Sequence, residues 1–242
     1  MAPRASTEGA CVQLSPASVP IPPDLRVAED DWPFLYLKKP MIPSLSRRGA
    51  FIMGIIWLLM LRLFGWRWGQ DDARLQITMV LLGAGFMLLE TKAVVHMALI
   101  LGSTWTVNAV VFSAVLVMIL LANLWVLKRK PGSLTPYYAG LIAMLGLNFA
   151  MPMHSFLGLP QAAQVVAAGT LVLSPIFYTS AIFAVLFRGV VSPERALAHN
   201  TAGALIGGFG ENISLLLGFN SLIAVAAVIY CASWALVGKR MR

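Results

Sequence analysis

The sequence predicts an all-α, polytopic helical membrane protein with about seven transmembrane segments, within a range of six to eight, and an extended N-terminal arm. Two observations predict this class. First, 59% of the 242 residues are hydrophobic and only 12% are charged, with a mean hydropathy of +0.79, whereas soluble domains carry about 25% charged residues. Second, apolar runs of about 20 residues, the length that crosses a bilayer core, recur along the chain.

The arm, residues 1–48, precedes the first apolar run. Residues 1–27 contain five prolines and no continuous apolar core, which favours an extended segment over a signal peptide. The stretch "AEDDWPFLYLKKP" (28–40) is typical of an interfacial or docking segment, because aromatic and basic side chains gather at membrane surfaces. We expect it to dock on a partner or on the protein's own surface through five residues. These are Asp30, Asp31, Trp32, Phe34 and Tyr36.

The transmembrane domain is predicted to cover residues 49–238, followed by a basic cytoplasmic tail, 239–242. The expected spans are 49–66, 75–101, 105–127, 138–157, 164–187, 201–217 and 220–237.

Basic loops indicate which ends face the cytoplasm. The segments "KRKPGS" (128–133), "RGVVSPERA" (188–196) and "GKRMR" (238–242) fall on one side if every span crosses. Seven crossings place the arm on the other side, although the arm carries four basic residues of its own near the first span. A break or re-entry within 75–101 would remove this conflict, and the sequence leaves the choice open.

The net charge of +8 is spread singly or in short clusters between apolar runs. This distribution favours basic membrane edges and argues against nucleic acid as a partner. Membrane lipid and other protein subunits are the expected partners.

Three ionisable residues lie inside one apolar run, "GFMLLETKAVVHMAL" (85–99): Glu90, Lys92 and His96. Charged groups at the bilayer centre cost about 2.5–3.5 kcal/mol each, so they face protein or water and find partners. Lys92 and His96 share one helix face, whereas Glu90 lies about 200° around the helix from Lys92. Glu90 is therefore either an ion site or a clamp to another helix.

A second intramembrane acid, Glu211, stands beside Asn212. Glu90 and Glu211 on separate helices predict, as one hypothesis, a transporter or channel site for a small cation or polyamine. As the alternative, they are separate structural clamps. Asn108 and further amides inside the spans are expected to form hydrogen bonds between helices.

Glycines concentrate at "LLGAGF" (81–86) and "TAGALIGGFGEN" (201–212). Small residues at four-residue spacing let helix backbones approach closely, which predicts tight helix packing rather than a ligand cradle. The glycines concerned are Gly83, Gly85, Gly203, Gly207 and Gly208.

No metal site and no cofactor are predicted, apart from bound lipid. The "AMPMHSF" stretch could bind a soft metal through His154 and its neighbouring methionines, and His96 or His154 could ligate a haem or a pigment metal. Nothing in the flanking sequence supports either reading.

Four segments resemble one family, the C-terminal membrane half of bacterial spermidine-synthase-like membrane proteins. They are "DDWPFLYL" (30–37), "GAGFMLLETKAV" (83–94), "GSTWTVNAVVFSAVLVMILLAN" (102–123) and "LIGGFGENISLLLGF" (205–219). The resemblance covers about residues 24–238. It implies that Glu90, Thr91, Lys92, Asn108 and Glu211 occupy family positions, whereas Asn212 stands where the family usually has an aromatic residue. It also implies a location in the bacterial cytoplasmic membrane.

In that family the membrane half accompanies a soluble aminopropyltransferase-like domain. Such a domain needs a glycine-rich loop, but Gly9 is the only glycine in residues 1–48. The sequence therefore predicts a non-catalytic membrane subunit or anchor, with a separately encoded synthase-like domain among its potential partners. The transporter is the alternative, and an intramembrane enzyme ranks last.

Overall fold

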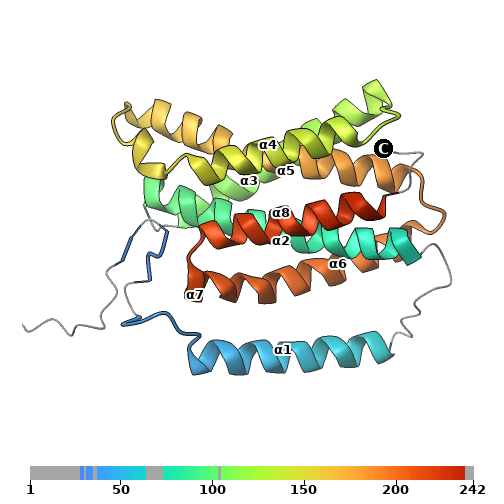
Figure 1. Cartoon of the computed structure of the whole chain (residues 1–242), viewed down its shortest axis with the longest axis horizontal. Helices are drawn as coiled ribbons and strands as arrows, with labels where there is room; N and C mark the ends of the chain where they lie inside the picture. The colour runs from blue at the N-terminus through green and yellow to red at the C-terminus, as the bar shows by residue number, and fades with distance from the viewer. Residues whose placement is uncertain (1–27, 30, 35–36, 64–72, 103–104, 238–242) are drawn as a thin grey trace, which may run out of the picture.

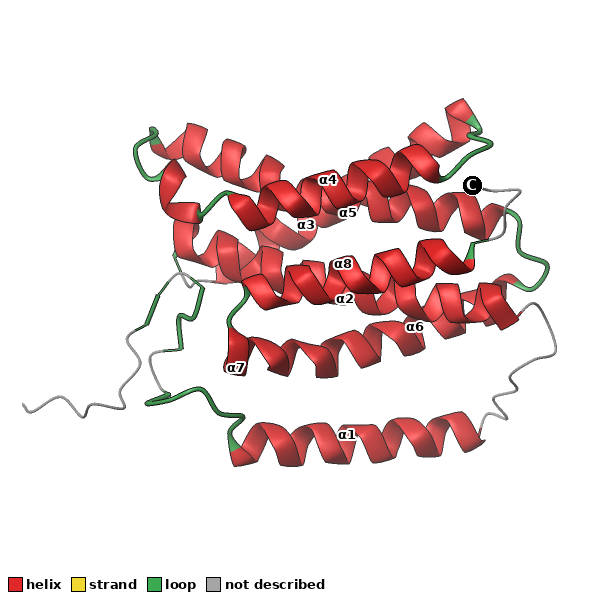
Figure 2. Cartoon of the chain, viewed as in Figure 1, coloured by secondary structure: helices red, strands yellow, loops and turns green. Residues whose placement is uncertain are grey.

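The computed structural model describes residues 28–29, 31–34, 37–63, 73–102 and 105–237, and these residues are helical apart from short connections (Figure 2). This confirms the predicted all-helical class. Glu29 and Trp32 form an isolated β-bridge. The helices of the described part are α1 (Ser44–Leu63), α2 (Ala73–Leu101), α3 (Trp105–Arg129), α4 (Thr135–Ala150), α5 (Gln161–Arg188), α6 (Pro193–Gly210), α7 (Ser214–Leu217) and α8 (Asn220–Leu236), with 3-10 turns at Met153–Phe156 and Glu211–Ile213.

Helix α2 lies at the centre of the bundle. It packs against α6, α8, α5 and α3, and α4 lies outside it against α5 and α8 (Figure 1). The suggestion that residues 75–101 break or re-enter is wrong, because α2 is one continuous helix of 29 residues. Its polar side chains do not open the helix, because Lys92 finds a partner on α8 and His96 bonds to the backbone of α2 itself.

The expected span 201–217 differs from the observed elements. Helix α6 begins earlier, at Pro193, and ends at Gly210, after which a 3-10 turn and α7 continue the chain. The Ser214 hydroxyl donates to the Glu211 carbonyl at 2.7 Å, and the Asn212 amide donates to the Phe209 carbonyl at 3.0 Å. Such side-chain bonds compete with helical backbone bonds, so the helix tightens into a 3-10 turn here.

Glycine brings the backbones of α2 and α6 together. A Cβ atom on Gly83 would overlap the Asn200 carbonyl, and one on Gly203 would overlap the Val80 carbonyl. A Cβ on Gly207 would lie 2.5 Å from the Ala84 carbonyl oxygen. Close backbone approach of this kind increases the dispersion contacts between the two helices.

The other two glycines of the predicted set behave differently. A Cβ on Gly85 would overlap the ring of Tyr230 on α8, so this glycine makes room for a side chain rather than a backbone. Gly208 has open space where its Cβ would stand. The prediction of tight packing at Gly208 is therefore wrong, because this face of α6 borders a cavity.

Proline inside α5 is compensated by a neighbouring helix. Pro175 has no backbone N–H, so the Leu171 carbonyl lacks its usual helical donor. The side-chain amide of Asn148, on α4, donates to that carbonyl at 2.7 Å, and the Ser174 hydroxyl donates to it at 2.9 Å. The α4–α5 contact thus satisfies a group that the helix itself leaves unpaired.

Successive long helices run in alternating directions (Figure 1). The end of α3, with Lys128 and Arg129, and the end of α5, with Arg188, therefore lie at the same end of the bundle as the start of α6. The arm reaches the opposite end, where α7 meets α8.

Among the residues that the structure describes, three helices are long and apolar enough to cross a membrane, namely α2, α3 and α5. The outer face of α3 is strongly apolar, with Leu116 and Leu127 each 65% exposed. Exposed apolar surface on this scale is typical of contact with lipid or with another protein.

Helix α1 stands apart from the rest (Figure 1). Phe51 and Leu58 are 70% and 60% exposed, and a cavity of about 780 Å³ separates the helix from α6. Met53 and Trp57 line it on one side, and Leu205, Gly208 and Phe209 line it on the other.

Candidate functional site: the docked arm and the polar cluster beneath it

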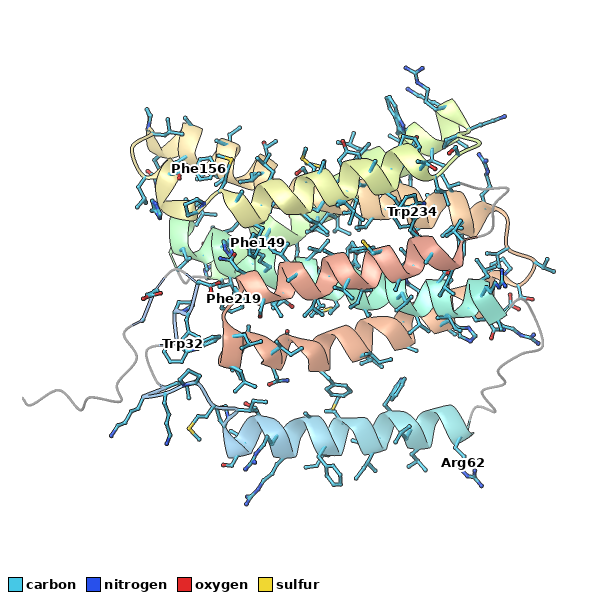
Figure 3. The ribbon with its side chains drawn as sticks, in the orientation of Figure 1. Trp32, Arg62, Phe149, Phe156, Phe219 and Trp234 are labelled. Atoms are coloured by element: carbon cyan, nitrogen blue, oxygen red, sulfur yellow. The ribbon has the colours of Figure 1, made fainter. Side chains whose placement is uncertain are left out.

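The arm closes one end of the bundle through Trp32. Its indole is fully buried, and its Nε1–H donates to the Leu215 carbonyl in α7 at 3.0 Å (Figure 3). The Phe34 ring packs edge-on to Trp32 at 5.6 Å and against Phe219 at 5.3 Å. A buried Trp with its N–H satisfied combines a large apolar contact with a fixed direction.

Asp31 holds the start of α8. One carboxylate oxygen accepts a bond from the Asn220 backbone N–H at 2.6 Å, and the Asp31 carbonyl accepts from the Phe219 N–H at 2.8 Å. Helix N-termini present unpaired N–H groups and a partial positive charge, so an acidic side chain stabilises them. The carboxylate of Asp31 thus caps α8 from a distant part of the chain.

Gly218 makes this capping possible. Its φ of +91° lies in the region that side chains avoid, and a Cβ on Gly218 would overlap the Asp31 carboxylate. The glycine therefore supplies both the turn between α7 and α8 and the space that Asp31 occupies.

Lys92 lies beneath the docked arm and is only 3% exposed. Its Nζ donates to the Asn220 side-chain oxygen at 3.4 Å, while the Asn220 backbone N–H donates to Asp31. Asn220 therefore links the ammonium of α2 to the carboxylate of the arm. A buried ammonium needs such a nearby counter-charge and hydrogen bond, because removing it from water is costly.

His96 follows one turn after Lys92, as the shared helix face predicts. Its Nδ1 donates to the Lys92 carbonyl at 3.1 Å, and its ring lies edge-on to Phe219 at 6.5 Å. Donation from Nδ1 leaves Nε2 as the acceptor of the neutral ring.

A cavity of about 440 Å³ adjoins this cluster. It is lined by His96 and His154, by Glu29 and Asp31 of the arm, and by Asn220, together with Phe149, Met151 and Pro152. The structure thus brings the two histidines of the sequence analysis to one polar cavity. Within the part of the chain that the structure describes, however, no three His, Cys, Asp or Glu side chains are grouped closely enough to bind one metal ion.

Of the two acids, Glu90 and Glu211, the structure places only Glu211 at the large cavity beside α1. Glu211 borders the 780 Å³ cavity beside α1, and Glu90 is not among the residues that line it. The contact between their segments comes from Thr91, whose hydroxyl donates to Glu211 Oε2 at 3.0 Å. Glu90 and Glu211 are both partly buried.

Other predicted site residues lie apart from this cluster. Asn108 is exposed in the first turn of α3 and is not among the residues that line the cavity beside His96. The side-chain amide of Asn212 donates to the Phe209 carbonyl, within its own turn. Asp30 and Tyr36 lie outside the described residues.

The sequence placed Asn220 among the amides expected to bond between helices, and its bond with Lys92 confirms this. Sequence reasoning missed the contact of Asn220 with Asp31 and the role of Gly218. Glycine and a small amide before an apolar run indicate a helix start, and that signal could have drawn attention to both. Their partner Asp31 stands 189 residues away from Asn220, a distance at which no sequence pattern identifies the pair.

No protein family, curated protein or solved structure matches this chain. Fold and site together define its class as an all-helical bundle with helices long and apolar enough to cross a membrane, one end of which is closed by its own N-terminal arm.

Proposed function

We propose that this chain is a non-catalytic integral subunit of a bacterial cytoplasmic-membrane complex, crossing the bilayer seven times and packing against other protein subunits. The alternating helices support an odd number of crossings from α1 to α8. The basic ends of α3 and α5 support a cytoplasmic orientation for that end of the bundle, with the arm on the opposite side.

The polar cluster supports a structural role for the buried charges. Asp31, Asn220 and Lys92 are bonded in series, and Thr91 bonds to Glu211. These hydrogen bonds pair polar groups that are costly to bury. They also join the arm, α2, α8 and the α6–α7 turn. Interhelical hydrogen bonds in membranes contribute about 0.6 kcal/mol each on average, enough in combination to hold a segment in place.

The observation that carries the proposal is the separation of α1 from the bundle. Helix α1 has 20 residues, is apolar and borders a cavity of about 780 Å³. It therefore buries little of its surface against the rest of this protein. Side chains of a partner helix, packed against the exposed faces of α1 and α6, would fill the cavity and bury both faces.

The resemblance to the membrane half of spermidine-synthase-like proteins supports the same proposal. It favours a separately encoded synthase-like domain as one partner, meeting the end of the bundle where the arm docks.

The test is purification of the tagged protein in mild detergent, combined with a photo-cross-linking residue at Leu58 on α1. We expect one partner of constant stoichiometry by native mass spectrometry, cross-linked from Leu58. The matched control for non-specific capture places the photo-cross-linking residue at Leu120 on α3, a position that is 56% exposed. A protein that is consistently alone, with cross-links only to lipid or to itself, would contradict the proposal.

A further inference from the structure

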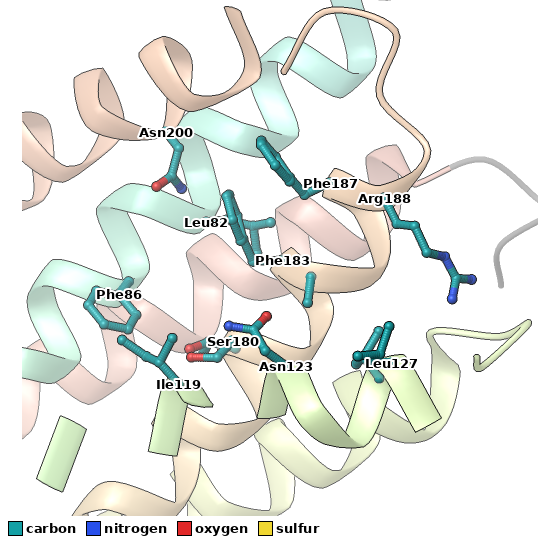
Figure 4. A pocket seen from close by; sticks show the side chains of 13 residues that line it. Leu82, Phe86, Ile119, Asn123, Leu127, Ser180, Phe183, Phe187, Arg188 and Asn200 are labelled. Atoms are coloured by element: carbon teal, nitrogen blue, oxygen red, sulfur yellow. The ribbon is translucent and has the colours of Figure 1, made fainter. Parts of the chain in front are cut away.

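A second cavity, of about 350 Å³, lies between α3 and α5 with α2 and α6 behind it (Figure 4). Most of its wall is apolar, with Leu82, Phe86, Ile119 and Phe183 among the lining residues. Five polar side chains interrupt that wall: Asn123, Thr179, Ser180, Arg188 and Asn200. Thr179 and Asn200 already donate to backbone carbonyls, those of Ile176 and Met79. The side chains of Ser180 and Asn123 line the cavity from two neighbouring helices, α5 and α3 (Figure 4).

Ser180 is buried without a partner. The side chain is 7% exposed, and its Oγ has no hydrogen bond within the described part of the chain. A helical serine usually donates to the carbonyl three or four residues earlier. The carbonyl four residues before Ser180, that of Ile176, already accepts from the Thr179 hydroxyl at 3.1 Å. Within the described part of the chain the Ser180 hydroxyl bonds to neither of these carbonyls, which leaves it for a group inside the cavity.

The depth of these groups restricts the ligand. Helix α5 ends at Arg188, and the rise of about 1.5 Å per residue puts Ser180 about 12 Å below that end. Asn123 lies about 9 Å from the end of α3 at Arg129 by the same measure. Arg188 also lines the cavity, but it is the last residue of α5 and stands about 12 Å from the level of Ser180. An anionic headgroup at the level of Ser180 would lose its hydration without this cation beside it, and an acyl chain offers no acceptor. A neutral carbonyl group carries no charge that must be hydrated, and its oxygen can accept a hydrogen bond.

The walls restrict the shape of the ligand. Phe86 and Phe183 provide flat aromatic faces, and the Phe183 ring stacks on Phe187 at 5.3 Å, which holds it in place. Aromatic walls favour a flat ring. The volume of about 350 Å³ is at the lower end for small-molecule sites. It suits a ring headgroup whose tail leaves past Leu127, which is 65% exposed at the rim.

We propose that this cavity binds the ring of a membrane-soluble quinone, with the Ser180 hydroxyl and the Asn123 amide donating to its carbonyl oxygens and the apolar tail lying in the lipid. The proposal is for binding alone. It is independent of the proposed subunit role, because the cavity is on the α3–α5 side of the bundle, away from α1.

The experiment uses the full-length protein in nanodiscs of one defined phospholipid. A short-tailed ubiquinone analogue is titrated, and a photoreactive azido-quinone maps the site by peptide mass spectrometry. We expect saturable binding, labelling of α3 and α5 peptides, and at least about tenfold weaker binding in Ser180→Ala and in Asn123→Leu. Thr170→Ala on α5 is the matched control, because Thr170 is exposed, does not line the cavity and bonds to its own helix. Its affinity should equal that of the unchanged protein.

Thermal unfolding without quinone separates a binding role from a structural one. Removing an unpaired hydroxyl should leave the melting temperature of Ser180→Ala equal to or above that of the unchanged protein. A lower melting temperature would assign the hydroxyl a structural partner and overturn the proposal. Absence of saturable binding, unchanged affinity in Ser180→Ala, or phospholipid that quinone does not displace would overturn it equally.

Discussion

The Asn148 side-chain amide donates a 2.7 Å hydrogen bond to the Leu171 carbonyl, the group that Pro175 leaves without a helical donor. A buried carbonyl without a partner is costly, so an interhelical bond has replaced one that the helix cannot make. The same bond joins α4 to α5, which makes a local defect of one helix into a contact between two.

Asn148→Ala should lower the free energy of unfolding by about 1 kcal/mol, because the Ser174 hydroxyl still donates to the same carbonyl. In a Pro175→Ala background the backbone N–H is restored, so the cost of Asn148→Ala should fall. The measurement is a double-mutant cycle by thermal unfolding in detergent. Equal costs in both backgrounds would show that Asn148 does not compensate for the proline.

Gly203→Ala should destabilise the protein by about 1–3 kcal/mol, because its Cβ would overlap the Val80 carbonyl and push α6 away from α2. Gly208→Ala is the matched control on the same helix, where nothing occupies the Cβ position. Alanine has the higher helix propensity, so this control should be neutral or more stable by about 0.5–1 kcal/mol. Similar melting temperatures for the two variants would contradict the close packing of α2 and α6.

Trp32→Ala should release the arm, because a fully buried indole and its bond to Leu215 are lost. Replacing a buried Trp typically costs about 3–5 kcal/mol. Trypsin cleavage after the exposed Lys38 should accelerate, while Met41→Ala, at a position 45% exposed, should leave the rate unchanged. Equal cleavage rates in both variants would mean that the indole does not hold the arm.

Gly218→Ala should have the same effect as Trp32→Ala by a different route. The new Cβ is strained at a φ of +91° and overlaps the Asp31 carboxylate, so the cap on α8 should be lost. The expected result is faster arm proteolysis with the rest of the bundle still folded by circular dichroism. A variant with intact protection would show that Asp31 docks without the space that glycine provides.

Glu211→Gln should change stability little, because the glutamine side-chain oxygen can still accept from the Thr91 hydroxyl. Thr91→Val removes the donor and should cost about 0.5–1.5 kcal/mol. In vesicle uptake assays with polyamine or small cations, Glu211→Gln and Glu90→Gln should behave like the unchanged protein. Loss of a measurable uptake in either variant would favour a transport mechanism over the structural role.

Local sequence patterns predict the helices and the faces on which several side chains lie. Apolar runs of bilayer length predict the long helices α2, α3 and α5, because helical hydrogen bonds join residues only four apart and depend on nearby sequence. The four-residue spacing of Gly203 and Gly207 predicts that both lie on one face of a closely packed helix. The same spacing places Lys92 and His96 on one face of their helix.

Only the tertiary structure decided which of these residues meet. The bond from Asn220 to Asp31 spans 189 positions, and that from Thr91 to Glu211 spans 120. Glu90 and Glu211 looked equivalent in the sequence, yet Glu211 alone borders the cavity beside α1. Ser180 has the sequence context of an ordinary helical serine, yet its hydroxyl has no hydrogen bond within the described part of the folded chain. Sequence period sets the face on which a side chain lies, whereas its partner depends on how distant helices pack, and that is a property of the folded chain alone.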